Sequence, residues 1–435
     1  MKTQQQATSV PGALFADDGS GGWSAGSPAH PEPRVPQTMD IRARTMIPLL
    51  TLGTLLLAAC EEPQATPGGE VAVRDSAGVR IISLPETGGV QARDLALDPE
   101  WPAGSDLTFG ELVDLEVTSG GHVAVLDRMN AEVRVLDSEG RSAFAFGRPG
   151  EGPGEFSPHG LVSLARTDST LVVPDLQLQR ITEFREDGSV VALHALGPLD
   201  PSGLVYGLEW RAHPEGGLLA RLLAESEDAV VRFDGVEFDT LYIHPVPSRA
   251  GNRLLSPHLV WDTDPQGRIV LARSDHFEVR LWDPAEGRLD WIARREDAPR
   301  PLTATDIDHL ERLIRDDGDA MGASPAEQQE MLASIDFPEE APGITGILAA
   351  PDGGFWVQRA LPVAEMGRGA LRVGSAEGIG SAEWERLDSE GHFRGVVRFP
   401  EGFTPKRIRG RWIHGIMEDA LGVQSVARVA LPEGE

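Results

Sequence analysis

The stretch "GGHVAVLDRMNAEVRVLDSEGR" (residues 120–141) decides the fold of this chain. It holds two short runs of alternating apolar residues, separated by a polar loop after Asp127 and followed by a turn that ends on glycine. The stretch "DSTLVVPDLQLQRITEFREDGS" (residues 168–189) repeats the same order. Period-two alternation between turn residues predicts antiparallel strands joined by hairpins.

The glycines that close these turns measure the length of the repeat. Less regular copies follow downstream, and the closing glycines are Gly140, Gly188, Gly235, Gly287 and Gly391. Their spacings are 48, 47, 52 and 104 residues, and the last interval holds one unit that is enlarged by an insertion. A period near 48 with alternating strands predicts a repeated four-stranded antiparallel unit. A shorter sixth unit, at residues 406–431, ends the chain.

That sixth unit is one strand short, and the N-terminal region offers a strand to complete it. Residues 71–84, "VAVRDSAGVRIISL", carry two apolar runs around a turn. We therefore expect a strand near residues 79–82 to pair with the C-terminal unit and close the ring of sheets. Such closure would remove a sheet edge that favours aggregation.

Residues 146–190 resemble an NHL repeat. The matching positions of the family's pattern are Gly154, Phe156, Val173, Asp175 and Gly188. The Gly-rich loop at 147–156 is expected to cross between blades, with Phe156 packed between neighbouring sheets. Residues 71–433 as a whole resemble the six-bladed β-propeller lipoproteins of bacteria. The resemblance implies an all-β fold, a six-bladed β-propeller of four-stranded antiparallel blades.

The period of the apolar residues changes from two to about 3.6 within residues 303–335, between blades 4 and 5. Thr303 or Thr305 is a candidate helix cap, and Ser324, Pro325 and Glu327 form the pattern of a capping box. The sequence thus predicts a helical insertion. It could lie over one mouth of the propeller as a lid, or cover the side of a sheet as a flap.

Cys60 is the one cysteine of the chain and directly follows an apolar run. Residues 39–59 have the order of a secretory signal, with Arg42 and Arg44 before a short apolar segment. The ending "LAAC" resembles the lipobox of bacterial lipoproteins, which implies lipidation of Cys60. Glu61 in place of an aspartate favours the outer membrane over the inner.

The remaining N-terminal segments follow from this interpretation. Residues 60–70 would be a flexible linker to the propeller at 71–433. Residues 1–38 precede the signal, and their composition indicates a disordered leader or a start codon assigned too far upstream.

The chain has a net charge of −29, all of it carried after residue 59. Nucleic acid and bare anionic lipid would repel such a protein. We expect an exported monomer at the bacterial cell envelope, held to the membrane by its N-terminal lipid. No later apolar run approaches the length of a membrane span.

Catalytic and metal-binding motifs are absent from the sequence, and it predicts no cofactor. One positional set is more informative, because the residue at the end of the second strand of a blade is charged four times, at Asp127, Asp175, Arg273 and Arg359. Equivalent positions of a propeller form a ring near one face. The four could form mutual salt bridges or line a ligand site.

Two classes of function are compatible with the sequence. The first is a binding or scaffolding module for an envelope protein, peptide or glycan, and the sequence favours it. The second is a metal-assisted hydrolase or lactonase, which six-bladed propellers also host. An enzyme of that kind needs several metal-ligating side chains that converge on the axis, and the predicted ring offers too few.

Overall fold

The computed structural model describes residues 72–87, 89–102, 107–196, 205–223, 226–246, 254–295, 300–367 and 378–432. The described residues belong to one compact unit of the chain. Cys60 and the predicted signal and linker lie outside the described residues. Within them, no helix has the length and the hydropathy required to cross a bilayer.

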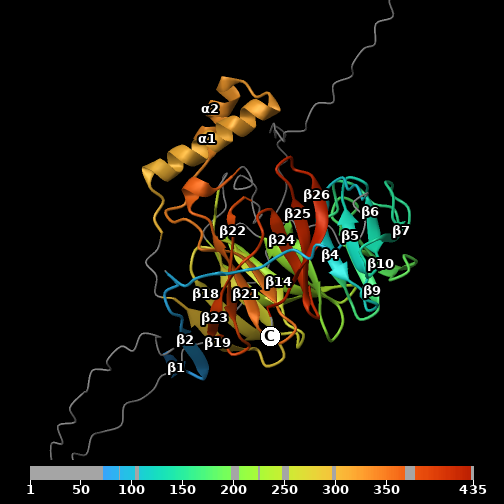
Figure 1. Cartoon of the computed structure of the whole chain (residues 1–435), viewed down its shortest axis with the longest axis horizontal. Coiled ribbons are helices and arrows are strands. Elements are labelled where there is room, and N and C mark those ends of the chain that lie inside the picture. The colour runs from blue at the N-terminus through green and yellow to red at the C-terminus, as the bar shows by residue number, and fades with distance from the viewer. Residues whose placement is uncertain are drawn as a thin grey trace, which may run out of the picture. The chain divides into compact units, whose positions relative to one another are not determined.

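Six small antiparallel sheets make up this unit and form a six-bladed β-propeller (Figure 1). Blade 1 consists of β4 (Leu112–Val117), β5 (Val123–Asp127), β6 (Glu132–Leu136) and β7 (Ser142–Phe146). Blade 2 consists of β8 (Ala165–Arg166), β9 (Thr170–Asp175), β10 (Arg180–Arg185) and β11 (Val190–Ala195). Blade 3 consists of β12 (Val205–Ala212), β13 (Leu218–Leu223), β14 (Glu227–Phe233) and β15 (Phe238–Pro245).

The second half of the ring follows the same order. Blade 4 consists of β16 (Leu259–Thr263), β17 (Ile269–Arg273), β18 (Glu278–Asp283) and β19 (Arg288–Arg294). Blade 5 consists of β20 (Ile344–Ala349), β21 (Phe355–Ala360), β22 (Gly380–Leu387) and β23 (Phe393–Arg398). Blade 6 has three strands, β24 (Phe403–Arg409), β25 (Trp412–Glu418) and β26 (Gln424–Ala430).

The structure confirms the predicted repeat in two respects, the glycine turns and the packing of neighbouring blades. Each closing glycine lies between the third and fourth strand of its blade and has a positive φ, for example 82° at Gly140 and 84° at Gly188. Phe156 is completely buried between blades 1 and 2, where its ring meets that of Phe184 edge-on at 5.7 Å. The sequence pattern therefore gave both the turns and the way neighbouring blades pack.

The antiparallel order of each blade gives the ring two faces. We call the face that carries the first hairpin of each blade, such as β4–β5, the hairpin face. The opposite face carries the turns between the second and third strands and the crossovers from one blade to the next, and we call it the crossover face.

The N-terminal strand does not close the ring where the sequence predicted. β2 (Val79–Ser83) pairs in parallel with β19, so it extends blade 4 and not the C-terminal blade. β1 (Val73–Ser76) pairs outside it. Ile82 explains this placement, because its side chain is 1% exposed in the core between blades 4 and 5.

The chain then continues along the outer edges of the next two blades, as the blue trace between β2 and β4 shows (Figure 1). β3 (Arg93–Asp94) pairs in parallel with β23 of blade 5. Leu97 forms an isolated antiparallel bridge with Val429 of blade 6. We call the described residues of 79–102 the strap, because they connect the outer edges of blades 4, 5 and 6 before blade 1 begins.

The end of the strap completes the contact that the prediction assigned to residues 79–82. Asp98 binds Arg428 through both its backbone N–H and its side chain, at 2.9 and 2.8 Å. The Arg428 guanidinium lies 5.1 Å from the ring centre of Trp101 and 3.9 Å from that of Trp412. Blade 6 is thus sealed by side-chain contacts and a single bridge.

The predicted helical insertion is present on the crossover face. α1 (Ala304–Met321) and α2 (Pro325–Ser334) both begin with a capping box, at Thr303 and at Ser324. Leu310 and Ile314 of α1 are buried against a cluster that includes Ala360 at the end of β21. The apolar stripe of α1 therefore fixes the insertion to blade 5.

Candidate functional site

The predicted ring residues Asp127 and Asp175 hold the backbone of their own blades. Both are completely buried. Asp127 accepts hydrogen bonds from the N–H groups of Gly110 and Glu111, at 2.8 and 3.1 Å, in the crossover before β4. Asp175 accepts one from Ser157 N–H at 2.7 Å in the crossover before β8. Each carboxylate thus pairs with buried N–H groups that would otherwise lack partners.

Arg273 and Arg359 make ion pairs within their own halves of the ring. Arg273 Nε donates to Asp275 at 2.5 Å. Arg359 donates to Glu385 at 2.7 Å and to Thr87 of the strap at 2.5 Å. Among the described residues, no hydrogen bond or ion pair joins either arginine to Asp127 or Asp175. Binding of a ligand by this set of four stays a prediction.

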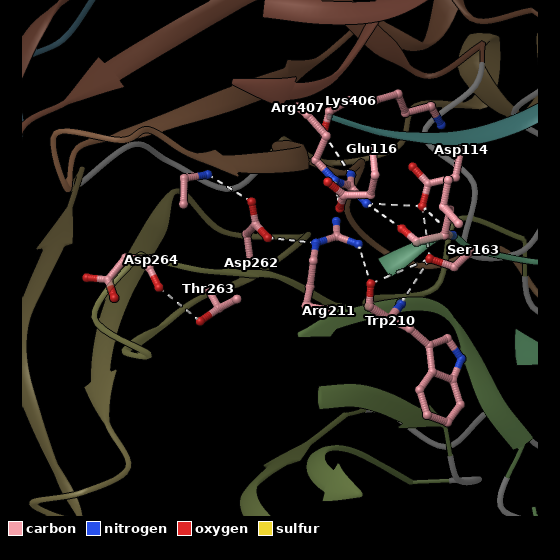
Figure 2. A network of polar contacts seen from close by, with 12 residues as sticks. Asp114, Glu116, Ser163, Trp210, Arg211, Asp262, Thr263, Asp264, Lys406 and Arg407 are labelled. Atoms are coloured by element: carbon pink, nitrogen blue, oxygen red, sulfur yellow. Dashed lines mark hydrogen bonds and ion pairs between the residues drawn. The ribbon is translucent and has the colours of Figure 1, made fainter. Parts of the chain in front are cut away.

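A second set of charged residues lies on the inner strands, around the axis of the propeller (Figure 2). Arg407 of blade 6 pairs with Glu116 at 2.5 Å and with Asp114 at 3.1 Å, both on blade 1. Asp114 accepts hydrogen bonds from Ser163 Oγ at 2.9 Å and from Leu164 N–H at 3.0 Å, which precede β8 of blade 2.

The same chain of contacts continues through the other three blades. Ser163 Oγ accepts from Trp210 N–H at 3.3 Å on blade 3. Arg211 pairs with Asp262 of blade 4 at 2.8 Å, and Asp262 accepts from Ala349 N–H of blade 5 at 2.8 Å. One polar chain therefore connects all six inner strands. We call it the channel belt, and its charged members are Asp114, Glu116, Arg211, Asp262 and Arg407.

The belt is buried, and its charges depend on each other. Arg407 and Asp114 are 7% and 6% exposed. Burial pushes the pKa of Asp114 upward, but Arg407, Lys406 and Arg211 outweigh it and hold that pKa below its usual value. Burial lowers the pKa of Arg407, but Asp114 and Glu116 outweigh it and raise that pKa above its usual value. Loss of one partner would leave a buried charge uncompensated.

A pocket of about 400 Å³ opens at the hairpin face, directly above the belt. Residues two apart on a strand point to the same side. The pocket residues His213, Asp264 and Arg409 follow the belt residues Arg211, Asp262 and Arg407 by two positions. The pocket thus lies one layer of side chains outside the belt.

Some polar side chains around this pocket have hydrogen-bond or ion-pair partners within the described residues, and others have none there. Asp264 is neutralised by Arg268 at 2.7 Å and by two backbone N–H groups. Arg166 pairs with Glu186 at 3.2 Å. Arg409 and the side chain of Asp168 are exposed and have no hydrogen bond or ion pair within the described residues.

His213 adds a hydrogen-bond donor to the pocket. Its Nδ1 accepts from Glu215 N–H at 3.2 Å, so Nε2 carries the proton of the neutral ring. Burial and the charge of Arg232 lower the pKa of His213, which keeps the ring neutral at pH 7. The residue is 8% exposed and lines the pocket, and Nε2 has no hydrogen-bond partner in the described part of the chain.

One group of side chains in the described residues has the spacing of a metal site. Donor atoms of Asp275, His276 and Glu340 lie within 4.8 Å of one another at the base of the helical insertion. Arg273 points its Nη2 at His276 Nε2, 3.2 Å away, so Nε2 accepts and the ring proton is on Nδ1. A metal on Nδ1 would need that proton on the other nitrogen, against Arg273. As arranged, the group fits an ion-pair cluster better than a metal centre.

The charged residues of the belt are visible in the sequence, although they form no known motif. The first strands "LVDLEV" and "LVWDT" place acids inside runs that are largely apolar, and "FTPKRIR" holds Arg407 between Pro405 and Ile408. A buried strand with charged members needs partners for them. The partners come from other blades, up to 293 residues away in the case of Arg407 and Asp114, so the pairing itself could not be derived.

No family model matches this chain, and no curated protein matches it. Solved structures that resemble it include a member of the DUF4221 family from Bacteroides vulgatus, with a TM-score of 0.47 and 10% identity over 77% of this chain and 94% of that one. A protein of Bacteroides fragilis that is named as exported has a TM-score of 0.43 and 11% identity, over 79% and 99% of the two chains.

The calcium-binding protein regucalcin from Agrobacterium tumefaciens has a TM-score of 0.43 and 11% identity over 78% of this chain and 97% of that one. Likenesses of this degree say nothing about the ligand or the activity of this chain. Its class, a six-bladed β-propeller, follows from its own strands.

Proposed function

We propose that this chain is an exported binding module, anchored in the bacterial envelope by lipid on Cys60, whose ligand enters the pocket on the hairpin face. The observation that supports a binding function is the pairing within the channel belt. Arg407 already pairs with Asp114 and Glu116, and Arg211 pairs with Asp262. Carboxylates at the axis are the ligands that a catalytic divalent cation would use, and here they are bound to guanidinium groups.

Anchoring is tested by Cys60→Ala. The variant should leave the membrane fraction and appear in the soluble envelope fraction, while the unmodified chain stays with washed membranes. A Cys60→Ala chain that persists in washed membranes would contradict lipid as the main anchor. Outer and inner membranes are then separated by density, and the outer membrane is the expected location.

Binding at the pocket is tested by obstructing it. Asp168→Trp places a large ring at the exposed edge of the pocket, and a matched Glu139→Trp places one on an exposed turn of blade 1. Envelope glycans, peptides and their fragments are screened by thermal shift. A ligand of the pocket should raise the melting temperature of the Glu139→Trp protein and not that of the Asp168→Trp protein. An equal effect on both would place binding elsewhere, with the ring of Asp127, Asp175, Arg273 and Arg359 as the next candidate.

The second candidate function, a metal-assisted hydrolase or lactonase, has the group of Asp275, His276 and Glu340 in its favour. Metal analysis of the purified protein by plasma mass spectrometry after mild dialysis separates the two. Binding without catalysis predicts less than one bound metal per chain. A stoichiometric divalent metal that is lost in His276→Ala would support the enzyme.

A further inference from the structure

We infer that the ligand of the pocket on the hairpin face is a small molecule that bears a carboxylate group. This inference rests on the proposed binding function. Three side chains around the pocket present N–H donors, Arg166, His213 and Arg409. A carboxylate accepts two or more such bonds, and guanidinium groups match its geometry.

The unused groups of the pocket include two donors, Arg409 and His213, and one acid, Asp168, and this excess of donors favours a ligand with acceptor oxygens. Among the described residues, the Arg409 side chain has no hydrogen-bond or ion-pair partner and His213 Nε2 is an unused donor on a side chain that is 8% exposed. The acid that lies deepest, Asp264, is 2% exposed and already bound to Arg268. His213 thus offers a donor on a nearly buried side chain and Arg409 offers donors on an exposed one, although the whole chain has a net charge of −29.

Asp168 is the one exception, and it gives the inference a distinctive test. It lies at the pocket edge, is exposed, and has no partner among the described residues. A free carboxylate at this place repels an anionic ligand. Removal of its charge should therefore strengthen the binding of an anion and leave a neutral ligand unaffected.

The size of the pocket sets the size of the ligand. A volume of about 400 Å³ is at the lower end of the range for small-molecule sites. It suits a single sugar ring or a dipeptide. Both can carry a carboxylate, as a hexuronate or as a free C-terminus, and the experiment separates these two sources.

The experiment is isothermal titration of the full chain carrying Cys60→Ala. The ligands are D-glucuronate and D-glucose as one pair, and Ala-Ala and its C-terminal amide as the other. The member with a carboxylate should bind at least about tenfold more tightly than its neutral partner, since charge-assisted hydrogen bonds are lost with the charge. The pair that shows the difference identifies the source of the carboxylate.

Three variants tie that difference to the pocket. Arg409→Gln should weaken carboxylate binding by about tenfold. The control Arg411→Gln changes an exposed arginine of the same turn that lies over Trp412 and does not line the pocket, and it should change nothing. Asp168→Asn should strengthen carboxylate binding severalfold and leave D-glucose unaffected.

Equal binding of both members of each pair, no binding of either carboxylate, or carboxylate binding unaffected by Arg409→Gln would overturn the inference. The proposed function fails separately. If a neutral ligand stabilises the Glu139→Trp protein and not the Asp168→Trp protein, the pocket binds ligands and only its preference for carboxylates is wrong.

Discussion

Four blades carry a charged residue at the end of the second strand. Blades 1 and 2, whose sequences follow the repeat closely, use this residue differently from blades 4 and 5, whose sequences follow it less closely. In blades 1 and 2 it is an aspartate, completely buried, that binds backbone N–H groups of the crossover. In blades 4 and 5 it is an arginine, partly exposed, that pairs with acids.

Every crossover must be fixed to the blade it enters, and a backbone hydrogen bond does so in both pairs of blades. Arg128 N–H donates to Glu111 C=O at 2.8 Å in blade 1, and Ala360 N–H donates to Gly343 C=O at 3.0 Å in blade 5. In blades 1 and 2 the aspartate adds side-chain hydrogen bonds to the crossover. In blades 4 and 5 the arginine makes other contacts, and Arg359 contacts the strap. Equivalent positions in the blades thus lie at the same place in the fold but have different structural roles.

The largest expected effect comes from removal of the strap, which lies along blades 4, 5 and 6. Removal of residues 72–102 deletes Ile82, Leu84 and Trp101, all at most 6% exposed. At ~1.5–3 kcal/mol for each buried side chain, the loss is about 5 kcal/mol or more, close to the whole stability of many domains. We expect the truncated protein to unfold or aggregate, as measured by urea denaturation and light scattering.

A shorter deletion tests whether the end of the strap stabilises the ring independently of its first part. Removal of residues 72–84 leaves the contacts of Asp98 and Trp101 with blade 6 in place. It should cost about 3–6 kcal/mol and preserve a cooperative transition. If the shorter deletion is as damaging as the longer one, the end of the strap does not seal the ring.

The second prediction compares the equivalent positions directly. Asp127→Ala leaves the N–H groups of Gly110, Glu111 and Asn130 without their acceptor. With ~1–2 kcal/mol for each unsatisfied group, we expect a loss of about 3–6 kcal/mol in the free energy of unfolding. Asp175→Ala should behave alike. Urea titration measures both, and a loss below about 1 kcal/mol would contradict the structural role of the aspartates.

The third prediction is a pH dependence whose largest contributions come from His258, before β16 of blade 4, and His414, in β25 of blade 6. Burial and Arg221 lower the pKa of His258 to about 4, and burial and Arg428 lower that of His414 to about 4. In the unfolded chain both titrate near 6.5, so between pH 6.5 and 4 protons bind mainly to the unfolded state. The free energy of unfolding should therefore fall as the pH is lowered, by about 3 kcal/mol for each histidine.

Urea titrations between pH 7 and 4 measure this slope. His258→Gln should flatten the curve, and His122→Gln on blade 1 is the matched control, because its histidine is only half-buried, at the end of a hairpin turn. An unchanged slope in His258→Gln would show that His258 becomes protonated in the folded protein at ordinary pH.

The smallest effect is expected for Arg273, the more exposed of the two arginines. The side chain of Arg273 is 31% exposed, and its partner Asp275 lies two residues away. The side chain of Asp275 is only 9% exposed, but the arginine is partly solvated, so Arg273→Ala should lower the free energy of unfolding by only about 1 kcal/mol, the upper end for solvated ion pairs. A loss as large as that of Asp127→Ala would mean that both kinds of blade depend equally on this position.

The sequence by itself determined the repeat, the number of blades, the closing glycines and the helical insertion. These features depend on local chemistry, because alternation, turn residues and caps act within a few positions of each other. For the same reason Thr303 and Ser324 were identifiable as helix caps, and both cap their helices in the structure.

Only the tertiary structure decided where the strap binds and which charges meet on the axis. An apolar strand such as residues 79–83 fits several edges, and the space for Ile82 between blades 4 and 5 selects one of them. The channel belt likewise joins residues from six blades that share no local pattern. Contacts of this kind depend on how the ring closes, and closure brings together side chains that are hundreds of residues apart in the chain.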